Sequence, residues 1–142
     1  MGENRIKLVA ADMDGTLLNR ERKITKYTQN VIKKAMAQGV YFVPATGRAV
    51  NALPPELKEM EGIRYGIFSN GATIYDLKEE KVIYKNHFEM DRVLELMDFL
   101  KQFDLMESIS LNGQSYANKK EMENLVHTWI KASGHSEIMV ID

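Results

Sequence analysis

A largely apolar run at residues 6–11 (IKLVAA) is followed directly by an acidic turn at residues 12–15 (DMDG), and this junction constrains the fold most. Near-continuous apolarity is typical of a strand that is buried on both faces of a parallel sheet. Two more short apolar runs lie at residues 40–43 and 65–68, each after a helix-like segment. Alternating strands and helices at this spacing predict an α/β fold with a doubly wound, Rossmann-like parallel sheet.

Two helices are predicted between these strands. Thr25 or Thr28 can cap the first, which we expect to run to about residue 38 and to end before Gly39. The second is expected over residues 48–60, with an interruption at the two prolines 54 and 55. The apolar stripe expected on the first helix consists of Tyr27, Val31, Ala35 and Met36.

The pattern changes after the third strand. Residues 72–75 and 82–84 are rich in β-forming residues and predict a hairpin. We therefore expect a core domain over residues 1–86 and a separate, incomplete α+β domain over residues 87–142. The elements expected in the second domain are helix, strand, strand, helix and strand, at residues 90–103, 108–111, 115–117, 120–132 and 138–141.

Charge and composition exclude several classes of function. A net charge of −1 argues against a nucleic-acid-binding surface and against a polybasic membrane anchor. The absence of cysteine excludes disulfides, thiolate catalysis and cysteine-ligated metal sites. No apolar run approaches the roughly 20 residues that a membrane helix needs, and no apolar signal core precedes the first strand. We therefore expect a cytoplasmic protein whose partners include neither nucleic acid nor membrane.

Polar groups follow each of the three predicted parallel strands. In open α/β sheets, ligands bind outside the carboxyl ends of the strands, so we expect these groups to share one edge of the sheet. They are Asp12 and Asp14 after the first strand, Thr46, Gly47 and Arg48 after the second, and Asn70 and Gly71 after the third.

The acidic pair indicates phosphoryl chemistry. Two carboxylates on one edge repel each other unless a hard cation or a proton lies with them, and Mg²⁺ binds one or two carboxylates together with phosphate oxygens. One carboxylate can attack phosphorus to form an aspartyl-phosphate, and the other can act as general acid and base. Thr46 offers a hydroxyl and an N–H group at an expected helix start, which suits a phosphate. Arg48 is long enough to contact a substrate or a neighbouring carboxylate.

These motifs also resemble a known family. Residues 8–19 (LVAADMDGTLLN) closely resemble the first motif of the haloacid dehalogenase (HAD) superfamily phosphatases, and residues 44–48 (PATGR) resemble the second. With residues 69–72 (SNGA) after the third strand, the chain is similar to the Cof-type branch. The resemblance implies a HAD-like core followed by a partial α+β cap over residues 87–142. It also implies a Mg²⁺-dependent phosphatase that acts on a small phosphorylated metabolite such as a sugar phosphate.

The resemblance assigns roles by position. Asp12 would be the nucleophile and a Mg²⁺ ligand. Asp14 would be the general acid and base, and its backbone carbonyl would be a second Mg²⁺ ligand. The residues implied to bind phosphate or substrate are Met13 (through its backbone N–H), Thr46, Gly47, Arg48, Asn70 and Gly71.

The family's third and fourth motifs, a lysine and a further acidic group, have no match in this chain. Its candidate lysines all lie in the cap-like half, at positions 101, 119, 120 and 131. We therefore expect a truncated chain, about the first half of a two-domain phosphatase. The alternative function is an inactive fragment or a phosphate-binding module. An incomplete sheet and cap also predict self-association through an exposed sheet edge or the cap.

Each motif also has a purely structural interpretation. Residues 12–15 can be a strand-ending turn, Thr46 a helix cap, and Asn70-Gly71 a hairpin turn. The length of the first match and the second motif at the expected spacing favour the catalytic interpretation for the acidic pair.

Overall fold

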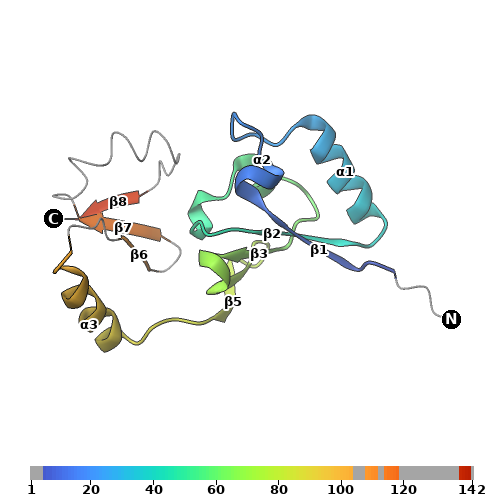
Figure 1. Cartoon of the computed structure of the whole chain (residues 1–142). Helices are drawn as coiled ribbons and strands as arrows, with labels where there is room; N and C mark the ends of the chain where they lie inside the picture. Colours follow the sequence, from blue (N-terminus) through green and yellow to red (C-terminus); the bar gives the residue numbers. More distant parts are fainter. Residues whose placement is uncertain (1–4, 104–107, 112–113, 119–137, 142) are drawn as a thin grey trace. The chain divides into compact units, whose positions relative to one another are not determined.

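The computed structural model describes residues 5–103, 108–111, 114–118 and 138–141 (Figure 1). The chain divides into two compact units, residues 1–85 and residues 86–142, and each is described by itself.

A five-stranded sheet forms the centre of the first unit, in the order β1-β2-β3-β4-β5. The first three strands are parallel, and the last two add an antiparallel hairpin. This arrangement confirms the predicted α/β class with a parallel Rossmann-like sheet and the predicted hairpin. The strands are β1 (Leu8–Asp12), β2 (Tyr41–Ala45), β3 (Tyr65–Phe68), β4 (Thr73–Asp76) and β5 (Lys81–Lys85).

The first helix, α1 (Lys26–Ala37), has the ends that its sequence predicts. The Thr25 hydroxyl accepts a hydrogen bond from the Thr28 N–H at 3.1 Å, so Thr25 is the cap. Gly39 lies just beyond the last turn with a φ of +82°, a conformation that glycine adopts without steric cost.

The predicted stripe of α1 is wrong in part. Ile32 is the buried residue of the helix, with Ala35 and Met36 partly buried beside it, whereas Tyr27 and Val31 face solvent.

The second predicted helix is much shorter than residues 48–60. It consists of a single 3₁₀ turn, Val50–Ala52, and a four-residue helix, α2 (Pro55–Lys58). Pro54 and Pro55 explain the break, because proline lacks an N–H donor and forces the preceding residue out of the helical region.

One hydrophobic core lies on one face of this sheet. Ile32 from α1 and Leu57 from α2 belong to the same buried cluster as Phe42 and Phe68 from the strands. Figure 1 accordingly shows α1 and α2 on the same side of the sheet. The interpretation of the first strand as buried on both faces is wrong, because Leu8 is 55% exposed and Val9 39% exposed. The physical reason is that, among the described residues, β1 lies at the edge of the sheet with β2 as its neighbour.

Asp76 closes the β4–β5 turn from inside the protein. Its side chain is 2% exposed, and its Oδ1 accepts the N–H groups of Lys78 and Glu79, each at 3.0 Å. Arg64 donates to the other oxygen at 3.0 Å. Burial opposes ionisation of Asp76, but the hydrogen bonds from Glu79, Arg64 and Lys78 outweigh it and lower the pKa below 3.8.

The second unit contains one described helix and a three-stranded sheet. The helix, α3 (Met90–Leu100), ends three residues before the predicted end. The strand order is β6-β7-β8, antiparallel and then parallel. The helix predicted at residues 120–132 lies outside the described residues. No helix in the described part of the chain is long and apolar enough to span a membrane. The three strands are β6 (Ser108–Leu111), β7 (Gln114–Asn118) and β8 (Ile138–Ile141).

Candidate active site

The carboxyl ends of the three parallel strands lie side by side. Asp12, the last residue of β1, is in register with Ala45 at the end of β2, and Ala45 is in register with Ile67 in β3. The segments that follow these strands therefore begin at one edge of the sheet. This edge brings together the acidic pair, the loop from Thr46 to Arg48 and the turn that contains Asn70.

The turn after β1 presents both aspartates to solvent. Met13 between them is fully buried, while Asp12 and Asp14 are exposed, as expected for side chains that alternate along an extended backbone. Gly15 follows with a φ of +79°, a left-handed conformation that favours glycine and turns the chain. The Thr16 hydroxyl then donates to Asp12 Oδ2 at 3.1 Å.

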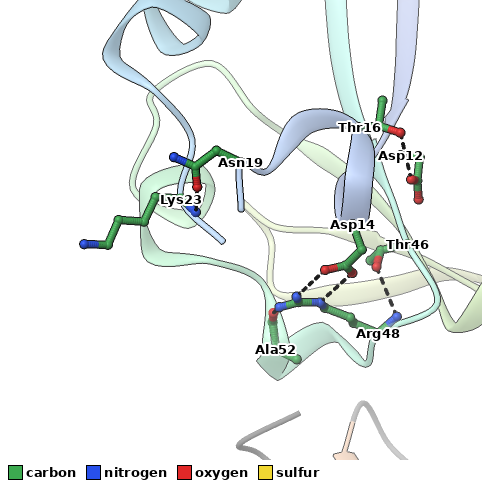
Figure 2. A network of polar contacts seen from close by, with 8 residues as sticks. All are labelled: Asp12, Asp14, Thr16, Asn19, Lys23, Thr46, Arg48 and Ala52. Atoms are coloured by element: carbon green, nitrogen blue, oxygen red, sulfur yellow. Dashed lines mark hydrogen bonds and ion pairs between the residues drawn. The ribbon is translucent and has the colours of Figure 1, made fainter. Parts of the chain in front are cut away.

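Arg48 holds the second aspartate through both of its oxygens (Figure 2). Its Nε donates to Asp14 Oδ2 at 2.9 Å and its Nη2 to Asp14 Oδ1 at 2.6 Å. Its Nη1 reaches the backbone carbonyl of Ala52 at 3.4 Å. The arginine side chain is only 12% exposed, whereas that of Asp14 is 50% exposed. A largely covered arginine side chain therefore orients a carboxylate that still faces solvent, and the bidentate geometry restricts rotation of the carboxylate.

Thr46 lies beside this ion pair, as Figure 2 shows, and its side chain is buried. Its hydroxyl oxygen accepts the Arg48 N–H at 3.2 Å, and its own N–H donates to the carbonyl of Ile67 at 2.9 Å. The expected helix start at Thr46 is wrong, because the first helical turn after it begins at Val50. Its backbone N–H is held by the sheet, so the hydroxyl hydrogen is the donor that Thr46 can offer to a ligand.

The Asn70 turn is attached to the Thr46 loop. The Ser69 N–H donates to the carbonyl of Arg48 at 2.9 Å, and the Asn70 N–H donates to the carbonyl of Thr46 at 3.2 Å. A Cβ atom on Gly47 would lie only 2.7 Å from Asn70 Oδ1, so the two segments approach closely here and a larger residue would displace the end of the Asn70 side chain.

The same turn connects β3 to the antiparallel β4, so its interpretation as a hairpin turn is also correct. Ser69, Asn70 and Gly71 have φ values of +49°, +54° and +94°, an unusual run in the left-handed region. Such strain is more frequent at functional sites than elsewhere, because the surrounding structure must maintain it.

Two contacts of the site were not predicted. The first involves Thr16, which lies inside the first motif but for which no role was predicted. Its position four residues after Asp12 places its hydroxyl within reach of that carboxylate. The carbonyl of Ala52 carries no signal in the sequence, because any residue has a carbonyl group. Figure 2 also shows Asn19, whose Oδ1 accepts the N–H of Lys23 at 2.9 Å and closes the loop after the motif.

The donor set of the site suits a hard cation, because it offers carboxylate oxygens. Asp12 and Asp14 offer oxygen atoms, which Mg²⁺ prefers, and Mg²⁺ usually keeps several waters beside one or two carboxylates. Among the residues that the structure describes, no group of three or more acidic, histidine or cysteine side chains could hold a metal.

An open α/β sheet with a carboxylate pair at its carboxyl edge defines a Rossmann-type ligand-binding fold. A family model of haloacid dehalogenase-like hydrolases matches residues 9–139. The chain therefore belongs to this family of hydrolases, and the resemblance predicted from residues 8–19 and 44–48 is confirmed.

Individual relatives agree with this assignment. A protein of Buchnera aphidicola (subsp. Schizaphis graminum) that carries a provisional phosphatase name is 38% identical over 121 residues, which cover 83% of this chain and 43% of that protein. The Bacillus subtilis 5-amino-6-(5-phospho-D-ribitylamino)uracil phosphatase YcsE is 37% identical over 89 residues, which cover 60% of this chain and 36% of YcsE.

A solved structure matches nearly the whole chain. The HAD-superfamily phosphatase BT1666 of Bacteroides thetaiotaomicron has a TM-score of 0.75 and 27% identity, and the match covers 99% of this chain and 51% of BT1666. The chain thus spans less than half the length of the first curated relatives and about half the length of this structural neighbour.

Proposed function

We propose that this chain carries the nucleophile, the general acid and base, and part of the phosphate pocket of a Mg²⁺-dependent phosphatase. One observation carries the proposal: two exposed aspartates flank the buried Met13 at the end of β1, and one of them is oriented beside the Thr46 hydroxyl. This arrangement offers one carboxylate for attack on phosphorus and a second for proton transfer.

The proposed reaction has two steps. A carboxylate oxygen of Asp12 forms a bond to phosphorus while the ester P–O bond breaks, and Asp14 donates a proton to the leaving oxygen. A water molecule then attacks the aspartyl-phosphate, and Asp14 takes its proton. Phosphate is released and the carboxylate of Asp12 is restored. Proton donation requires one oxygen of Asp14 to turn away from Arg48, so the observed ion pair corresponds to the resting arrangement.

The Thr46 hydroxyl, Gly47 and the Asn70 turn supply the proposed phosphate pocket. Thr46 donates through its hydroxyl, and Asn70 offers side-chain amide hydrogens at the same edge of the sheet. Gly47 and Gly71 allow close approach of the backbone to a ligand. In phosphoryl transfer, catalysis depends mainly on such positioning and on electrostatic stabilisation.

Mg²⁺ would be held by a carboxylate oxygen of Asp12 and the backbone carbonyl of Asp14. When bound, it would neutralise negative charge on the phosphoryl oxygens. Asp12 also accepts a hydrogen bond from the Thr16 hydroxyl, which limits rotation of its carboxylate.

The proposed substrate is a small phosphorylated metabolite such as a sugar phosphate, and the proposed compartment is the cytoplasm. The substrate class is supported by the 37% identical YcsE, whose name gives it a phosphorylated ribitylamino-uracil as substrate. Macromolecular partners such as nucleic acid or membranes form no part of the proposal.

The test is hydrolysis of an aryl phosphate by the chain, with and without Mg²⁺. We expect Mg²⁺-dependent turnover that falls to the buffer rate in Asp12→Asn. The matched control is Asp91→Asn, which changes an exposed aspartate in the first turn of α3 and should leave turnover unchanged. Equal turnover in wild type and Asp12→Asn would contradict the proposed nucleophile.

A second candidate is a phosphate-binding module without turnover. Its basis is the limited set of metal ligands among the described residues. In that case, titration with inorganic phosphate and Mg²⁺ should give saturable binding that Thr46→Val weakens, while aryl phosphate hydrolysis stays at the buffer rate.

A further inference from the structure

The turn after β1 brings the Thr16 hydroxyl onto the proposed nucleophile. Thr16 Oγ1 donates to Asp12 Oδ2 at 3.1 Å, and Figure 2 shows this contact apart from the ion pair between Asp14 and Arg48. Among the residues that the structure describes, Asp12 Oδ1 takes part in no hydrogen bond or ion pair. The two oxygens of this carboxylate therefore differ, because one is held by a hydroxyl and the other is available to react.

The backbone around Thr16 is anchored on both sides. Met13 is fully buried, and Leu18 is buried as well. The Leu18 N–H donates to the carbonyl of Met13 at 2.9 Å and so closes the turn that contains Thr16. Branching at Cβ also restricts the χ1 angle of threonine. The turn therefore keeps the hydroxyl of Thr16 close to Asp12.

The strength of this hydrogen bond depends on the chemical state of Asp12. A hydroxyl binds a carboxylate more strongly than a neutral carbonyl oxygen, because the charge on the acceptor assists the bond. In the proposed reaction, Asp12 is a carboxylate before attack and an acyl phosphate while it carries the phosphoryl group. The hydrogen bond from Thr16 is thus weakened when the phosphoryl group arrives and regained when it leaves.

We propose that Thr16 promotes the second step of the reaction, hydrolysis of the aspartyl-phosphate, and not the first. In the first step, Asp12 Oδ1 forms the bond to phosphorus, the ester P–O bond breaks, and Oδ2 becomes the carbonyl oxygen. In the second step, water forms a bond to phosphorus, Asp14 takes its proton, and the P–Oδ1 bond breaks. The electron pair of that bond returns to the carboxylate of Asp12, where the Thr16 hydroxyl stabilises it. This inference rests on the proposed catalytic function.

A purely structural role for Thr16 would have different consequences. If the hydrogen bond only held the turn in place, its loss would slow both steps alike. Both side chains are exposed, so the bond adds little to the stability of the fold. Its length of 3.1 Å also exceeds the most frequent O–H···O distance of about 2.7–2.8 Å, so we expect a modest kinetic effect.

The first experiment separates the two steps by rapid quenching with an aryl phosphate and Mg²⁺. Thr16→Val removes the hydroxyl and keeps the shape of the side chain. It should lower steady-state turnover by about threefold to tenfold, the usual range for one hydrogen bond. The initial release of aryl alcohol should be as fast as in wild type, and a larger fraction of the chain should carry phosphate.

Two further variants serve as controls. Thr16→Ser keeps the hydroxyl and should restore the behaviour of wild type. Thr28→Val removes a hydroxyl that lies 2.9 Å from the Thr25 hydroxyl at the start of α1, away from the acidic turn. Its turnover and its phosphorylated fraction should equal those of wild type.

The second experiment does not depend on turnover. Beryllium trifluoride is tetrahedral like a phosphoryl group, and an aspartate oxygen can replace the water on its beryllium atom. When Asp12 Oδ1 forms this bond, wild type loses part of the Thr16 hydrogen bond, whereas Thr16→Val has none to lose. Fluorine NMR titration in the presence of Mg²⁺ should therefore show binding about twofold to tenfold tighter in Thr16→Val.

Each result decides the matter. An equal loss in both steps, or no difference between Thr16→Val and wild type in either experiment, would overturn the proposal and leave the proposed function intact. Failure of Thr16→Ser to restore the second step would also overturn it. If wild type showed neither turnover nor the beryllium adduct, the proposed function would be contradicted, and this inference with it.

Discussion

Two aspartate–arginine pairs in the first unit have opposite patterns of burial. In one, the carboxylate of Asp76 is 2% exposed and the side chain of Arg64 is 45% exposed. In the other, Arg48 is 12% exposed and Asp14 is 50% exposed. The partner that lies inside the protein is fixed by its surroundings, and the other is presented to solvent.

This difference matches the proposed roles, a structural carboxylate in Asp76 and a proton-transferring carboxylate in Asp14. Asp76 accepts two backbone N–H groups in addition to its arginine, so its oxygens are used to hold the β4–β5 turn. Asp14 has the side chain of Arg48 behind it and solvent in front. A carboxylate must be accessible to a substrate if it is to transfer a proton, and Asp14 meets that condition.

The largest difference between the two pairs should appear when each carboxylate is neutralised. Asp14→Asn should lower aryl phosphate turnover by about 10²–10⁴-fold, the usual contribution of a general acid or base. Its urea unfolding midpoint should change little, because the side chain is half exposed. Asp76→Asn should instead lower the unfolding midpoint. If Asp76→Asn reduced turnover while the fold remained intact, the distinction would be wrong.

The second largest effect is expected when each of the two arginines is replaced. Arg48→Lys replaces a bidentate fork with a single ammonium group and should lower turnover by up to about 10²-fold through misplacement of Asp14. Arg64→Lys is the control, since Arg64 holds the structural pair, and it should leave the kinetics unchanged. The turnover rate at saturating substrate is measured for both variants. Equal loss in the two variants would show that Arg48 does not act through Asp14.

The loop that carries Arg48 lies close to the Asn70 side chain at Gly47. Gly47→Ala would place a methyl group 2.7 Å from Asn70 Oδ1, the end of a flexible side chain that can shift, so we expect a loss of only about 1 kcal/mol in the free energy of unfolding. The double variant Gly47→Ala, Asn70→Gly removes the clashing side chain and keeps a residue that tolerates positive φ. Urea unfolding should show recovery in the double variant, and no recovery would rule out the contact as the cause.

The smallest expected effect is the acid sensitivity of the structural pair. Because the pKa of Asp76 is below its ordinary 3.8 in the folded chain, the stability contributed by its ionised form is complete above that pH. This contribution is lost as the pH falls below 3.8 toward the folded-state pKa. Thermal unfolding between neutral and strongly acidic pH should show less acid destabilisation in Asp76→Asn than in wild type.

Much of the fold could be predicted because its signals are local. The succession of strands and helices along the chain, the cap at Thr25, the hairpin and the break at Pro54 all follow from neighbouring residues, whose backbone angles and hydrogen-bonding groups restrict each other. The family was predictable for a similar reason, since residues 8–19 form one continuous motif. The roles of the individual site residues, the domain boundary at residue 86 and the cap assignment stay predictions.

The wrong predictions about α1 and the first strand have a common cause. The core face of α1 was misassigned because Tyr27 and Val31 are apolar at helical spacing, yet they do not face the sheet. The first strand looks like an internal strand by composition, but its place at the edge depends on which strands lie beside it. Neither fact can be read from the residues of the element alone.

Residue order along the chain is sufficient to establish the α/β class, the acidic motif and its place at the end of a strand. Three-dimensional contacts alone show that Arg48 pairs with Asp14, 34 positions away, and that Gly47 lies against Asn70. They also show that Thr46 has no helix directly after it. The physical reason is that these features depend on side chains and loops from separate strands, which become neighbours only after the sheet has formed.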